Sequence, residues 1–144
     1  MKKAFCIFSL AMLLLLSACS ANKNEQLINN PEEISKYIKI IDCYVEKAPD
    51  ENTITSNSEA VVKYQNISDK TLTTVLIYVD YLDKKGKPIG FVPLVTDAEN
   101  IVLPNHIEVV KEELFFGNPK PEDIYGKEWN GRVQPNIVHI CVSK

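Results

Sequence analysis

The sequence predicts a small all-β domain, an antiparallel β-sandwich, that follows a short export segment. Six or seven short runs of β-branched and aromatic residues are separated by turn residues, at the spacing typical of a sandwich. No stretch after residue 40 is long enough for the crossover helix that a parallel sheet requires. The first residues instead form a charged start and an apolar run, which is the pattern of a signal peptide.

The strands are expected where apolar and polar side chains alternate. The strongest prediction is residues 71–82, because nearly all of them are β-branched or aromatic and apolar groups on both faces favour a central strand. Pro88 and Pro93 confine the next run to a sheet edge, since proline has no N–H to donate to a second neighbour. The predicted strands are residues 38–47, 59–65, 71–82, 89–94, 107–116 and 136–143.

The export segment ends in a motif with a specific meaning. Two lysines precede the apolar residues 4–16, a run too short for the roughly 20 residues of a membrane-spanning helix. The run closes on Leu16, Ser17, Ala18 and Cys19, which resembles the lipobox of bacterial lipoproteins. The resemblance implies that residues 1–18 are removed and that Cys19 carries a thioether-linked diacylglycerol. The alternative is an ordinary secretory signal that is cleaved nearby.

The lipobox resemblance also implies a location. In that family the new amino group of the cysteine is usually acylated as well, with a chain such as palmitate. Two or three acyl chains hold a protein at a bilayer where one chain does not. We therefore expect a cell-envelope protein anchored to a membrane. Ser20, rather than Asp, resembles the outer-membrane sorting pattern, so in a bacterium with two membranes the expected site is the outer membrane, facing the periplasm.

The expected organisation has three parts. Residues 1–18 are the signal peptide, and residues 37–144 are the sandwich. Between them, residues 19–36 comprise the lipidated cysteine, a polar tether and a possible short helix. That helix is expected at Asn30 and Pro31, because they offer a capping side chain followed by a proline at the first helical position.

Residues 61–90 resemble the small immunoglobulin-like sandwiches of the FxLYD kind, found in many bacterial lipoproteins. The likeness covers a strand, a polar turn, a long alternating strand, an Asp-x-x-Gly turn and a return strand that ends in glycine. Residues 79–83 stand where the literal motif would be and do not reproduce it. The resemblance implies an immunoglobulin-like fold and a non-catalytic spacer or binding module. The matching residues are Val62, Asn66, Ser68, Lys70, Thr71, Val75, Ile77, Val79, Asp83, Gly86, Ile89 and Gly90.

Charge and motifs argue against several classes of function. Loss of residues 1–18 takes away two lysines and no acid, so the formal net charge falls from −3 to −5. This balance disfavours nucleic acid as a partner. No nucleophile elbow, phosphate loop or dinucleotide fingerprint occurs, and His106 and His139 do not have metal-ligand spacing. We assign no catalytic residue, cofactor or metal; the alternative is an envelope enzyme with a site built from scattered loop residues.

Two cysteines remain once Cys6 leaves with the signal and Cys19 is lipidated. An even number of cysteines in an exported chain predicts a disulfide, here between Cys43 and Cys141. Such a bond would join the first predicted strand to the last. The alternative is two buried free thiols.

The long connection predicted at residues 117–131, together with Arg132 directly after it, carries the candidate contact residues for an envelope partner. Tyr125, Trp129 and Arg132 are of the types most enriched at binding hot spots. Under the alternative, Trp129 folds down to close one end of the sandwich, with Tyr125 packed beside it.

Overall fold

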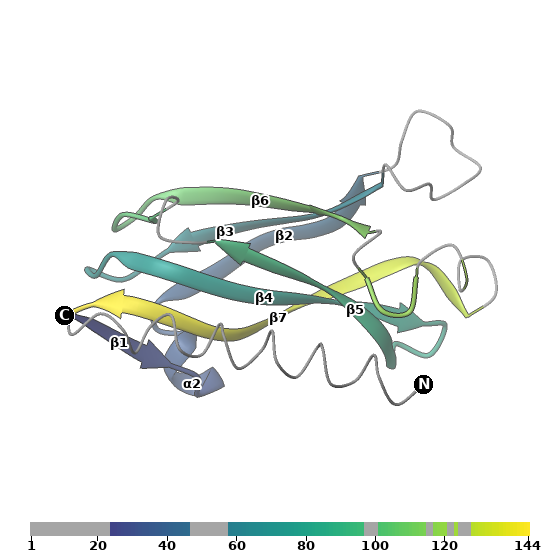
Figure 1. Cartoon of the computed structure of the whole chain (residues 1–144), viewed down its shortest axis with the longest axis horizontal. Coiled ribbons are helices and arrows are strands. Elements are labelled where there is room, and N and C mark those ends of the chain that lie inside the picture. Colours follow the sequence, from purple (N-terminus) through teal and green to yellow (C-terminus); the bar gives the residue numbers. More distant parts are fainter. Residues whose placement is uncertain (1–23, 47–57, 97–100, 115–116, 121–122, 124–127) are drawn as a thin grey trace.

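The protein is an all-β sandwich of two antiparallel sheets, as the sequence predicts (Figure 1). The computed structural model describes residues 24–46, 58–96, 101–114, 117–120, 123 and 128–144. One sheet has four strands in the order β1-β7-β4-β5, and the other has three in the order β2-β3-β6. The elements are β1 (Glu25–Ile28), α2 (Pro31–Ile34), β2 (Ile38–Glu46), β3 (Glu59–Asn66), β4 (Leu72–Asp83), β5 (Pro88–Thr96), β6 (Ile107–Glu113) and β7 (Trp129–Ser143).

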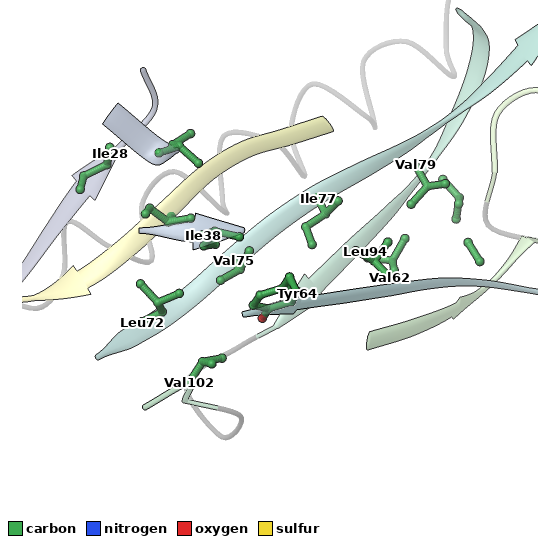
Figure 2. Packing of buried hydrophobic residues seen from close by; sticks show 14 of the residues in the cluster. Ile28, Ile38, Val62, Tyr64, Leu72, Val75, Ile77, Val79, Leu94 and Val102 are labelled. Carbon is green, nitrogen blue, oxygen red and sulfur yellow. The ribbon is translucent and has the colours of Figure 1, made fainter. Parts of the chain in front are cut away.

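The core lies between the two sheets. Figure 2 shows Val62 of β3, Ile77 of β4 and Leu94 of β5 among the side chains that fill this space. Alternation along each strand places every second residue in the core, because successive side chains point to opposite faces. Burial of one such side chain stabilises the fold by about 1.5–3 kcal/mol. β4 is central in its sheet, with β5 on one side and β7 on the other, as its two apolar faces predict.

The sandwich begins earlier than the sequence suggests. The expected tether includes β1, which pairs with β7 so that Leu27 lies opposite Cys141. It also includes α2, the predicted short helix, which begins where Asn30 accepts hydrogen bonds from the backbone N–H groups of Glu32 and Glu33. Ile28 and Ile34 are buried in the core. The boundary at residue 37 is therefore wrong, because two apolar side chains tie this segment to the domain.

The last strand is also longer than expected. β7 begins at Trp129, so the predicted connection ends before that residue and not at Gly131. The pairing of β7 with β4 shifts between Leu76 and Ile77, which lie opposite His139 and Ile137. This bulge places Ile137 against the core, whereas strict alternation predicts that it shares a face with His139.

The turn between β4 and β5 follows the predicted chemistry. The Asp83 carboxylate accepts hydrogen bonds from the backbone N–H groups of Lys85 and Lys87, each at 2.8 Å. Gly86 adopts φ +82°, which a residue with a Cβ rarely does. β5 is an edge strand, as Pro88 and Pro93 predict.

Candidate interaction surface

Trp129 belongs to the core and not to a contact surface. Its side chain is 1% exposed, and its ring centroid lies 4.6 Å from that of Tyr81. The indole Nε1 donates a 2.6 Å hydrogen bond to the carbonyl oxygen of Arg132. The prediction that Trp129 contacts a partner is therefore wrong, and the alternative reading of a buried residue is confirmed for it. Arg132 is exposed, on a strand rather than a loop, and Tyr125 lies outside the described residues.

The predicted disulfide is not formed, because Cys43 is a free thiol. Cys43 lies on β2 and packs against the inter-sheet core. Cys141 lies on β7 between Ile140 and Val142, which both face the core, so Cys141 points to the other side of the four-stranded sheet. The even cysteine count could not reveal these opposite orientations. Cys19 lies outside the described residues.

Cys43 is a weak nucleophile in this position. Burial raises the pKa of its thiol to about 11, and the neighbouring negative charge of Asp42 adds to the effect. The reactive species is the thiolate, which is scarce at neutral pH when the pKa is that high. Cys43 is therefore a packing residue rather than a site of chemistry.

The two histidines occupy different environments. His106 is exposed, and its Nε2 lies 3.8 Å from a carboxylate oxygen of Glu108. His139 is buried, and burial lowers the pKa of its imidazole. Within the described ranges, no group of three histidine, cysteine or acidic side chains is placed to hold a metal ion.

The surface with the clearest distinguishing character is the outer side of the four-stranded sheet, which faces away from the core. Val95 and Leu27 are 41% and 37% exposed, and Pro93 is half-buried. The rings of Tyr78 and Phe91 stack with centroids 4.4 Å apart and an interplanar angle of 16°. We call Leu27, Tyr78, Phe91, Pro93 and Val95 the outer apolar face.

The strand register explains why these residues gather. Val95 lies opposite Leu76, and Pro93 lies opposite Tyr78, so β4 and β5 present apolar pairs to the same side. Leu76 is itself buried, although it alternates with core residues and points to this outer side. The double-sided apolar pattern of residues 71–82 was the sequence signal for this surface.

Polar and charged side chains also lie on this outer side, where the exposed Gln134 and Asn136 of β7 stand opposite Asp80 and Tyr78. Asp80 lies on this side of β4, and burial raises the pKa of its carboxyl group. Glu25, on β1 two residues before Leu27, shares that strand face. Arg132 is the exposed cation of β7, next to the core-packed Val133.

The outer side of the three-stranded sheet has a different character. Lys111 forms an ion pair with Glu46 and a second one, at 3.6 Å, with Glu59. Lys63 lies opposite Asp42 on the neighbouring strand. Charged side chains of both signs thus cover this side. They are Lys39, Asp42, Glu46, Glu59, Lys63, Lys111 and Glu113.

The described residues line at least two hollows. One, of about 320 Å³, is lined at the β4–β5 turn by Asp83, Lys84, Lys85, Ile89 and Glu128. The turn's own N–H groups occupy the Asp83 carboxylate and lower its pKa. The other, of about 210 Å³, opens between β5 and β6, beside Thr96 and Glu108. The hollow at the β4–β5 turn is therefore lined by charged loop residues, and its central acid, Asp83, already stabilises the turn through its hydrogen bonds.

Comparisons with known proteins give no relative. No protein-family model matches the chain, and no curated protein or solved structure matches it either. No helix within the described ranges is both long and apolar enough to cross a membrane.

Proposed function

We propose that the chain is a lipid-anchored lipoprotein of the cell envelope, whose sandwich serves as a non-catalytic binding or structural module. The observation that carries the proposal is the position of the Leu16–Cys19 motif relative to the fold. The first strand begins at Glu25, so five residues separate the candidate lipid site from the sandwich. Cleavage before Cys19 would leave every described element intact.

The chemistry of the two parts supports the same proposal. Each buried CH₂ of an acyl chain adds about 0.8 kcal/mol to membrane binding, so two or three chains at Cys19 give a stable anchor. The immunoglobulin-like resemblance of residues 61–90 supports a binding or structural role for the sandwich. The partners are then the membrane, through the lipid, and another envelope component; the outer membrane is the proposed location in a bacterium with two membranes.

The test compares two cysteine-to-serine variants of the full chain in a bacterial host. Cys19→Ser should remain unprocessed and carry no acyl mass, because the acceptor thiol is gone. Cys43→Ser is the matched control, since Cys43 is a free thiol in the sandwich. It should be cleaved, acylated and membrane-bound like the natural chain.

Intact mass and membrane fractionation report the result. A Cys19→Ser protein with the processed mass and the natural acyl mass would overturn the proposal. So would a natural chain without acyl mass that stays in the soluble fraction.

A further inference from the structure

We propose that the outer apolar face lies flat against the lipid bilayer to which the protein is anchored. This inference rests on the proposed lipidation of Cys19 and adds an orientation to it. The four-stranded sheet then faces the membrane, and the charged side of the three-stranded sheet faces water.

The short tether keeps this face near the anchor. From Cys19 to Glu25 the chain can span at most about 20 Å, at roughly 3.3 Å per residue. Glu25 begins β1, the edge strand of the four-stranded sheet, and Leu27 follows two residues later. Strands lie about 4.8 Å apart, so β5 is only about 14 Å across the sheet from β1. The whole outer apolar face therefore lies within reach of the membrane surface.

The composition of the face fits a lipid surface. Leu27 and Val95 are exposed apolar side chains at its two edges. Tyr78 adds an amphipathic ring, of the type enriched where membrane meets water. Asp80 is an acid on this side, and burial raises the pKa of its carboxyl group, which lowers the cost of protonating it at a membrane. The charged outer side of the three-stranded sheet would have to lose its hydration in the same position, at a large free-energy cost.

Cations lie at both ends of the four-stranded sheet. Lys84, Lys85 and Lys87 form the β4–β5 turn at one end. Lys144 follows β7 at the other end, where its N–H donates to the Asn24 carbonyl oxygen. Cations at the rim of an apolar face are attracted to anionic lipid head groups.

The test places a fluorophore on either side of the sandwich. Val95→Cys and Val109→Cys are matched, because both valines lie on edge strands and are 41% and 47% exposed. The full lipidated protein, with Cys43→Ser and Cys141→Ala in both variants, is labelled and reconstituted in vesicles of phosphatidylethanolamine and phosphatidylglycerol. A fraction of the lipid carries a spin-label quencher. We expect several-fold stronger quenching at position 95 than at position 109.

Each other outcome has a defined meaning. Equal quenching at both positions in acylated protein overturns the orientation and leaves the proposed lipidation standing. A fluorophore at position 95 that is shielded from water but is not quenched by the lipid also overturns the orientation. That result assigns the face to a protein contact, such as a second copy of the chain. Absence of acyl mass on the natural chain refutes the proposed function and the orientation together.

Discussion

The outer sides of the two sheets differ more in charge than in apolar content. Leu27 and Val95 are exposed on one side, and Ile107 and Val109 are exposed on the other. On the three-stranded sheet, however, these apolar groups stand among seven charged side chains, of which Lys111 forms ion pairs with Glu46 and Glu59. On the four-stranded sheet, apolar residues of β4 and β5 face one another in register, whereas β7 presents Asn136 and Gln134 beside them. Exposure alone therefore does not identify an interaction surface; the cross-strand neighbours do.

The comparison also separates structural residues from surface residues. An antiparallel sheet commonly packs one face on the core and leaves the other in water. The three-stranded sheet follows this rule, whereas the outer side of the four-stranded sheet carries half-buried apolar residues on β4 and β5. Substitutions in the core shared by the two sheets should have effects that do not depend on the character of either outer side. Substitutions on the outer sides should have effects that do.

The largest expected effect is that of Trp129→Ala. The side chain is fully buried and its indole N–H is hydrogen-bonded, so truncation should lower the free energy of unfolding by about 3–5 kcal/mol. Arg132→Ala is the control on the exposed surface and should stay within about 0.5 kcal/mol of the natural protein. Urea unfolding measures both. Equal, small effects of the two substitutions would show that Trp129 does not stabilise the core.

Asn66→Ala should come next, because this side chain ties the end of β3 to the segments that enter the other sheet. It is fully buried, and its Nδ2 donates to the carbonyl oxygens of Lys70 and Val102, at 2.7 and 3.0 Å. The substitution removes both of these bonds and also the Oδ1 acceptor of the Ser68 N–H, at a combined cost of about 2–3 kcal/mol. Asn136→Ala, on the exposed part of β7, is the control and should be nearly neutral. A neutral Asn66→Ala would mean that water replaces the side chain.

These residues show what the sequence could and could not predict. The alternation of residues 71–82 predicts β4 and its central place, because periodicity is a local property. β1 has no such pattern, and it exists because it pairs with β7 over a hundred residues away. The Asn30 cap was predictable because it acts within one turn.

The candidate site was harder to predict than the fold. Residue type made Trp129 a candidate contact, but burial decides its role, and burial depends on Tyr81 on another strand. The cysteine count predicted a disulfide, although Cys43 faces the core and Cys141 points to the other side of its sheet. The outer apolar face needs the register of β4 with β5, which no local pattern specifies.

An acid-dependent effect should distinguish the two histidines. Burial lowers the pKa of His139 below its ordinary value of 6.5, so the unfolded chain binds a proton at a higher pH than the folded one. The contribution of neutral His139 to the free energy of unfolding is complete above about pH 6.5. It is lost as the pH falls through the pKa that His139 has in the folded state. We therefore expect the natural protein to lose stability between pH 7 and pH 5 more steeply than His139→Leu.

The control for that experiment is His106→Leu. His106 is exposed near Glu108, so His106→Leu shows what the loss of a surface histidine alone does to the acid profile. The difference between each variant and the natural protein removes the contributions of the carboxyl groups. Identical profiles for the natural protein and His139→Leu would contradict the role of His139.

The smallest expected effect concerns the charged outer side. Lys111 pairs with Glu46 and Glu59, and the hydrogen bond to Glu46 is the main reason that the pKa of Lys111 is raised. Glu46, Glu59 and Glu113 lie in one cross-strand row, so Lys111→Ala leaves three acids side by side. Like charges in register repel. The variant should therefore lose a small amount of stability at low salt.

Salt makes this last prediction specific. The Debye length falls from about 10 Å at 0.1 M ionic strength to about 3 Å at 1 M, so the loss should nearly vanish in concentrated salt. Lys39→Ala is the control, because Lys39 lies on the same side opposite Gln65 rather than beside the glutamate row. Melting temperatures at the two salt concentrations measure the difference. A loss of stability that persists in 1 M salt would show that Lys111 acts through packing of its alkyl chain. The ion pairs of the charged outer side would then contribute less to stability than the comparison of the two outer sides implies.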